Sequence, residues 1–199
     1  MSTVHVSRRT APLIDLVVPR SLLADVVLVG GGALLTALAA QIVVPLQPVP
    51  FTLQTFSVLL VGAALGSLRG ALSMLVYLAA GVIGLPVFAS ASGGAHVVFG
   101  ATGGYLVGFV LAAWIVGFIA ERGGGRILPT VGALLAGSAT VYLVGVPWLA
   151  VALGMPLSVA VGVGLAPFLV GDLIKLAAAA MLLPGAWAVI ARLTGKAGR

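Results

Sequence analysis

Asp172 and Lys175 place a carboxylate and an ammonium group three residues apart within a long apolar segment. Each would cost about 2.5–3.5 kcal/mol at the centre of a membrane helix, so their presence there calls for a reason. Residues i and i+3 share a helix face, so both side chains can point into one cavity. A carboxylate accepts hydrogen bonds and an ammonium group donates them. The pair therefore predicts a site for a neutral ligand with N–H and C=O groups, such as a cyclic urea or amide, or for a zwitterion.

An ion pair that only holds the helices together is the alternative to a ligand site. We favour the ligand because no other buried charge is expected and because the pair falls near the non-cytoplasmic side.

The composition indicates which elements must hold the pair. Hydrophobic residues make up 61% of the 199 residues and charged residues only 7%, which is typical of an integral membrane protein. Because a spanning helix needs ~20 mostly apolar residues, we expect an all-α protein with six transmembrane helices. The chain has no cysteine, which excludes disulfides and thiol catalysis.

Apolar runs between proline, glycine and charged residues mark the six expected helices. They cover residues 22–44, 55–68, 70–83, 100–120, 127–146 and 168–191. The second and third could form one broken span, but Arg69 would then lie in mid-membrane with no acid beside it, so two spans are favoured. The apolar run 22–40 is longer than the ~7–15 residues of a secretory signal, so we expect a retained first span.

Lysine and arginine indicate the orientation. Nine of the ten lie on one side of the six-helix arrangement: Arg8, Arg9, Arg20, Arg69, Arg122, Arg126, Arg192, Lys196 and Arg199. The positive-inside rule then makes both termini cytoplasmic. We expect residues 1–20 to be a cytoplasmic segment, 21–192 a single transmembrane substrate-binding domain and 193–199 a cytoplasmic tail. No basic stripe with interleaved aromatic residues indicates a nucleic acid partner.

The three loops on the opposite side, 45–54, 84–99 and 147–167, contain no lysine or arginine and are rich in proline and glycine. Uncharged, non-helical backbone at membrane depth must be buried in protein or line a cavity, so we expect a lid over the charged pair. Candidate ligand contacts in and beside these loops are Phe51, Thr52, Gln54, Phe88, Ser90, Ser92 and Tyr105.

Motifs for covalent catalysis are missing. The chain lacks GxxxxGK followed by serine or threonine, so it cannot hydrolyse ATP by that route. His96 has no second ligand candidate beyond His5, and we expect no metal and no cofactor. An intramembrane enzyme using Asp172 as a base and a purely structural subunit are the less favoured alternatives.

Ala33 and Ala37 have the small-xxx-small spacing that lets helices approach closely in lipid. Such a face could dock another protein, and packing inside the bundle is the alternative.

Four motifs in order carry a resemblance to a known family. They are QPVPFTLQ at 47–54, GLPVF at 84–88, GGYL with GF at 103–109, and PF followed by GD and Lys175 at 167–175. Together they resemble the BioY family, the biotin-specific substrate-binding (S) components of energy-coupling factor (ECF) transporters. Ala101 and Val170 stand where many members would have proline.

The resemblance implies a multi-pass protein of the bacterial inner membrane. It would bind biotin on the outer side and deliver it inward with a transmembrane coupling protein and two cytoplasmic ATPases. Asp172 and Lys175 would hydrogen-bond the ureido ring, with Ser90 or Ser92 adding a further bond. Three aromatic residues would pack on the ligand and two alanines would face the coupling protein: Phe51, Phe88 and Tyr105, and Ala33 and Ala37. An S component for another small vitamin is the alternative.

Overall fold

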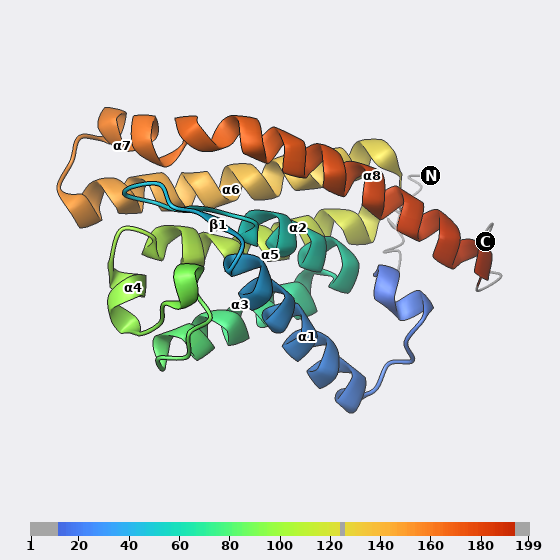
Figure 1. Ribbon diagram of the computed structural model, residues 1–199. Coiled ribbons are helices and arrows are strands. Elements are labelled where there is room, and N and C mark those ends of the chain that lie inside the picture. The colour runs from blue at the N-terminus through green and yellow to red at the C-terminus, as the bar shows by residue number, and fades with distance from the viewer. Residues whose placement is uncertain (1–11, 124–125, 194–199) are drawn as a thin grey trace, which may run out of the picture.

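The computed structural model describes residues 12–123 and 126–193, and nearly all of its regular structure is helical. In chain order the elements are η1 (Leu13–Leu16), α1 (Leu22–Ala40), β1 (Val43–Val44), β2 (Phe51–Thr52), α2 (Gln54–Leu65), α3 (Ser67–Val82), η2 (Ala89–Ala91), α4 (Ala95–Phe99), α5 (Gly103–Gly123), α6 (Ile127–Leu153), α7 (Leu157–Gly164), η3 (Ala166–Phe168) and α8 (Leu169–Leu193) (Figure 1). The strands form an antiparallel pair, with Val43 opposite Thr52.

Helix length decides which segments can cross a membrane. Four segments in the described ranges are long and apolar enough: Leu22–Ala40, Gly103–Gly123, Ile127–Leu153 and Leu157–Leu183. Helices α2 and α3 have 12 and 16 residues, or about 18 and 24 Å, against ~30 Å of hydrocarbon. The mostly helical membrane fold is confirmed, whereas six spans and the side on which the termini lie stay predictions.

Helices α2 and α3 fold back on each other at Gly66. The backbone of Gly66 has a φ of +86°, which residues other than glycine rarely adopt. A Cβ atom added to Gly70 would lie only 2.9 Å from the Cα of Gly62. Two residues eight apart in one continuous helix would be separated by about 12 Å. The two segments are therefore separate helices rather than one broken span.

The prediction that residues 147–167 form a third loop is wrong. Helix α6 continues to Leu153, and α7 occupies residues 157–164. Pro147 suggested a helix end in the sequence, but it lies inside α6. Proline is tolerated inside membrane helices because neighbouring groups satisfy the freed backbone groups. Trp148 also lies within α6, and its indole N–H donates to the carbonyl of Gly100 at 2.9 Å.

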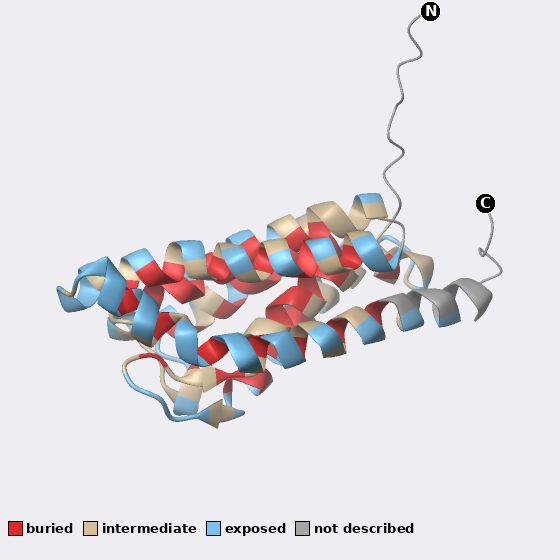
Figure 2. Ribbon diagram, turned by 90° about the horizontal axis from the view of Figure 1, so that it is seen from above, coloured by how far each residue is buried: buried red, intermediate tan, exposed pale blue. Residues whose placement is uncertain are grey.

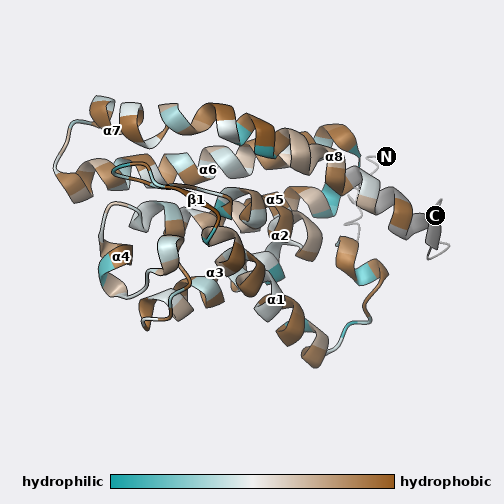
Figure 3. Cartoon of the chain, viewed as in Figure 1, coloured by the Kyte–Doolittle hydropathy of each residue, from teal (hydrophilic) through white to brown (hydrophobic). Residues whose placement is uncertain are grey.

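Helix α5 is the central element and packs against α2, α3 and α6. Its residues Ala112, Ala113 and Val116 are fully buried. Viewed from above, buried residues line the inner faces of the helices and exposed residues the outer faces (Figure 2). Those outer faces carry large apolar side chains, such as Leu22 at 83% and Val151 at 85% exposed, and hydrophobic residues run along α1 and α8 (Figure 3). Such a surface suits contact with lipid.

A cluster of charged residues lies at the end of the bundle where η1 packs on α2 and α8. Arg69 contacts Asp15 at 2.5 Å and Asp25 at 2.6 Å, and Arg20 contacts Asp15 at 2.7 Å. The side chains of Asp15 and Arg69 are only 6% and 13% exposed. As residues, Asp15 and Arg69 are only partly buried, so Asp172 and Lys175 are the only buried charged residues among those whose burial is described, as expected.

Burial alone would raise the pKa of Asp15, but hydrogen bonds and charge from Arg69 and Arg20 outweigh it and hold that pKa below its ordinary value. The segment before α1 is thus attached to the bundle by this ion cluster and by the buried side chain of Leu13.

Candidate ligand-binding site

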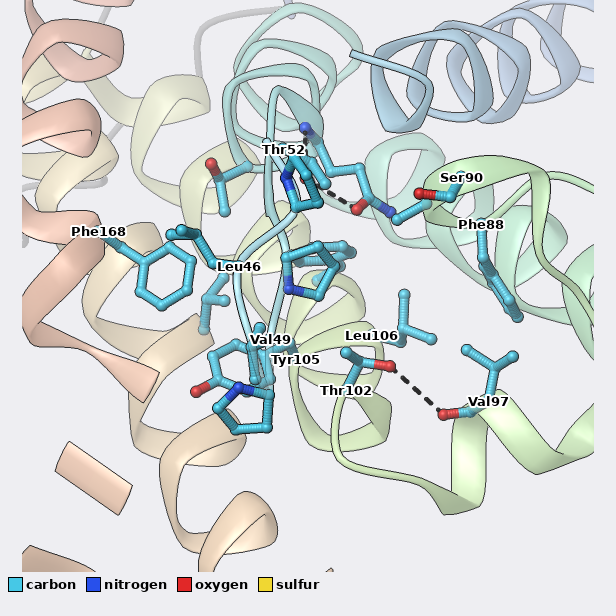
Figure 4. A pocket seen from close by; sticks show the side chains of 18 of the residues that line it. Leu46, Val49, Thr52, Phe88, Ser90, Val97, Thr102, Tyr105, Leu106 and Phe168 are labelled. Carbon is cyan, nitrogen blue, oxygen red and sulfur yellow. Dashed lines mark hydrogen bonds between the residues drawn. The ribbon is translucent and has the colours of Figure 1, made fainter. Parts of the chain in front are cut away.

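A cavity of about 290 Å³ lies where the β1–β2 connection, the loop after α3, and α2, α5, α6 and α8 meet. Figure 4 shows Phe168 and Phe88 on opposite sides of it. The lining is mainly apolar with a few polar groups: Pro45, Leu46, Gln47, Pro48, Val49, Pro50, Thr52, Gln54, Thr55, Phe88, Ala89, Ser90, Ser92, Val97, Thr102, Tyr105, Leu106, Phe109, Val141, Tyr142, Phe168, Asp172 and Lys175. Such a mixture is typical of small-molecule sites.

Lys175 uses all of its hydrogen-bonding capacity within the protein. Its Nζ lies 2.9 Å from Oδ1 of Asp172, 2.7 Å from the backbone oxygen of Thr52 and 2.9 Å from Oγ1 of Thr55. An ammonium group has three N–H donors, so none is left over. The ring of Phe51 adds a cation–π contact, with Nζ 3.9 Å from its centroid. Lys175 therefore joins α8 to β2 and to the start of α2.

Asp172 keeps spare capacity. Its Oδ1 accepts from Lys175 and, at 3.5 Å, from the hydroxyl of Thr55, and its Oδ2 accepts from the hydroxyl of Tyr142. An ionised carboxylate offers about four acceptor positions. A ligand N–H can therefore bind Asp172 without displacing a protein group, whereas a ligand C=O must replace an existing partner of Lys175.

The sequence did not predict Tyr142 and Thr55 as site residues. A signal existed for Tyr142, because a buried tyrosine hydroxyl usually has a hydrogen-bond partner. Thr55 is separated from Asp172 by 117 positions, so only the fold reveals their contact.

Thr52 and Gln54, both predicted, line the cavity in fixed orientations. The Thr52 hydroxyl donates to Oε1 of Gln54 at 2.8 Å, and Nε2 of Gln54 donates to the hydroxyl of Tyr77 at 2.6 Å. Both side chains are buried. The amide nitrogen carries two N–H groups, so its second one remains for a ligand.

The two predicted serines differ. Both line the cavity, but the Ser92 hydroxyl already donates to the carbonyl of Ala89 at 2.7 Å. Within the described ranges the Ser90 hydroxyl makes no hydrogen bond to protein. Ser90 is thus the better candidate for the additional ligand contact.

The predicted aromatic residues fall into two groups. Phe88 and Tyr105 line the cavity, and the Tyr105 hydroxyl donates to the carbonyl of Gly164 at 2.8 Å. Phe51 is not among the lining residues. Its ring stacks on that of Phe168, with ring centroids 6.0 Å apart, and makes the cation–π contact with Lys175.

The two alanines predicted to face a partner lie toward the inside of the bundle. Ala33 is 7% exposed and belongs to the core, and Ala37 is half-buried against that core. The exposed face of α1 instead carries Leu34 and Leu38, at 61% and 60% exposed, and Gly30. A partner approaching α1 in this structure would meet those residues first.

The chain is similar to proteins of one family. The family model described as BioY family matches residues 8–192. "Probable biotin transporter BioY" of Pyrococcus horikoshii is 43% identical over 148 residues, which are 74% of this chain and 86% of that protein. "Biotin transporter BioY" of Thermotoga maritima is 42% identical over 148 residues, with the same two shares.

A solved structure, the S-component for biotin from an ECF-type ABC transporter, has the same fold. The TM-score is 0.66 at 23% sequence identity, and the match covers 88% of this chain and 95% of that one. The family model spans nearly the whole chain, and both relatives exceed 40% identity over most of their length. The chain therefore belongs to the BioY family.

Proposed function

We propose that this protein takes up biotin as the substrate-binding component of an ECF-type ABC transporter. The observation that carries the proposal is the small cavity with a spare carboxylate acceptor, Asp172, in a chain whose relatives are named as biotin transporters. A transporter subunit of this family is not an enzyme.

The ureido ring of biotin matches the polar end of the cavity. A ring N–H donates to Asp172, and the ring carbonyl accepts from Lys175 after replacing Thr52 or Thr55 as its partner. Ser90 and the free N–H of Gln54 add further bonds. The sulfur-containing ring and the aliphatic chain pack on Phe88, Tyr105 and the other apolar walls. A volume of about 290 Å³ is at the small end of the ~300–1,000 Å³ typical of ligand pockets and suits a single small molecule.

Family membership and the charge distribution support our proposal for the rest of the uptake system. The protein crosses the bacterial inner membrane with both termini in the cytoplasm, as one six-helix domain over residues 21–192. The cavity faces outward. A transmembrane coupling protein and two cytoplasmic ATPases drive release inward, since the chain has no P-loop sequence of its own. No metal or resident cofactor takes part.

Equilibrium binding of labelled biotin to the purified protein in lipid nanodiscs tests the proposal. Saturable binding is expected, with unlabelled biotin competing and other vitamins failing to compete. Binding of another vitamin but not of biotin would identify a different substrate in the same architecture. Binding of no vitamin at all would overturn the proposal.

A further inference from the structure

The loop that carries Ser90 has an unusual backbone. Ser90 and Ala91 both lie in the left-handed region, with φ of 56° and 54°. Residues other than glycine rarely adopt this conformation, and two in succession need support from surrounding structure. We call residues 88–92 the lid loop. Phe88 and Ser90 from this loop lie at one edge of the cavity (Figure 4).

Gln41 supplies that support from outside the cavity. Its Oε1 accepts from the backbone N–H of Ala91 at 2.9 Å, and its Nε2 donates to the backbone oxygen of Phe88 at 3.2 Å. The two bonds bracket Ser90 on both sides. Gln41 is not among the residues that line the cavity, so its role is to act through the lid loop.

Gln41 is also fixed to α1. It is the first residue after the helix, and its Nε2 donates to the carbonyl of Ala37 at 3.0 Å. One side chain therefore connects the end of α1 to the lid loop, 47 and 50 positions further along the chain.

We propose that Gln41 is a positioning residue that holds the lid loop in its left-handed conformation, so that Ser90 and Phe88 face the bound ligand. Because the contact starts at the end of α1, the position of the lid loop depends on the position of α1. The effect on ligand affinity rests on the proposed function, whereas the effect on the loop does not.

The test is a double-substitution cycle of Gln41→Ala and Ala91→Gly in nanodiscs. Loss of the two neutral hydrogen bonds to the lid loop should weaken biotin binding at least about fivefold in Gln41→Ala. Glycine adopts the left-handed region readily, so the loop in Ala91→Gly needs less support, and Gln41→Ala should then weaken binding no more than about twofold. A purely structural role of Gln41 would give the same loss in both backgrounds.

Amide hydrogen exchange of residues 88–92 without ligand provides the second measurement. Exchange of the Ala91 amide should be faster in Gln41→Ala than in the wild type. Leu38→Ala, an exposed position near the same end of α1, is the control and should leave this exchange unchanged. Gln41→Glu keeps the acceptor for Ala91 without the donor for Phe88, so it should fall between, and it replaces Gln41→Ala if that variant does not fold.

Unchanged exchange of the Ala91 amide in Gln41→Ala would overturn the inference. So would unchanged biotin affinity in a wild type that binds biotin. A wild type that does not bind biotin would instead overturn the proposed function, and the exchange measurement would still decide the role of Gln41.

Discussion

Asp172 and Lys175 have different hydrogen-bonding states although they form one ion pair. Lys175 has three partners in the protein, while Asp172 has acceptor positions left. The two alternatives considered for the pair, a ligand site and a structural ion pair, therefore describe different properties of the same residues. Substitutions can separate them.

Replacing Asp172 with asparagine should weaken biotin binding by the protein that still folds, and it should also destabilise the fold because Lys175 loses its charged partner. The variant keeps the shape but loses the charged acceptor. Hydrogen bonds to charged groups contribute about 1.5–3 kcal/mol, so we expect affinity to fall about 10- to 150-fold, measured by equilibrium binding in nanodiscs. The control is Asp15→Asn. It makes the same change at a carboxylate of η1 that does not line the cavity and whose side chain is 6% exposed. Equal losses in both variants would contradict a ligand role for Asp172.

Replacing Lys175 with methionine should mainly destabilise the protein. It leaves Asp172 buried without its charged partner, and breaking one half of a buried ion pair costs about 3–5 kcal/mol. Thermal unfolding in detergent should show Lys175→Met as less stable than the Lys175→Met/Asp172→Asn double variant, because the double variant has no unpaired charge. A double variant less stable than both single variants would argue against this account.

The charged pair of the site was predictable because a charge stands out in an apolar sequence. Gln54 and Ser90 were identified from their polarity in apolar loops, and the structure places both at the cavity. Phe51 was harder, because its sequence position does not tell which side of a two-residue strand faces the cavity. Tyr142 was missed because its direction depends on how α6 is rotated in the bundle.

Among the elements, η1 is a short segment that is linked to α3 and α1 by ion pairs. Its Asp15 contacts Arg69 of α3, which in turn contacts Asp25 of α1. The sequence indicated only a cytoplasmic segment here, because four residues carry no periodic pattern. The long helices were predictable from their apolar runs, and the error came at Pro147, which lies inside α6 instead of ending it.

The ion cluster predicts a pH-dependent stability. The folded pKa of Asp15 is held below its ordinary value of about 3.9. Asp15 therefore contributes stability above pH ~3.9, and this contribution is lost as the pH falls through the lower folded value. Asp15→Asn should be less stable than the wild type at pH 7, by about 1.5–3 kcal/mol. The difference in unfolding temperature should shrink at pH 3, and a constant difference would contradict the assignment.

At the scale of the whole molecule, the end of the bundle with η1 and the end of α8 lies opposite the end with α4 and α7 (Figure 1). Arg126, just before α6, and Leu85, in the loop after α3, are both exposed and mark connections predicted to lie on opposite sides. The absence of cysteine makes single-cysteine labelling direct.

In whole cells, a membrane-impermeant maleimide should label Leu85→Cys, while Arg126→Cys should react only after the membrane is opened. The reverse pattern would invert the proposed orientation, and labelling of both positions in intact cells would contradict the six-span arrangement.

The saturated ammonium group of Lys175 bears on which molecules can occupy the cavity. A buried charge without partners is costly, but the ammonium group of Lys175 is paired with Asp172 and has three hydrogen-bond partners within the protein. Lipid tails and other apolar molecules, which are abundant around the protein, offer nothing that could take the place of Thr52 or Thr55. Only a molecule with its own hydrogen-bonding groups can therefore replace a partner of Lys175, which disfavours lipid tails at the polar end of the cavity.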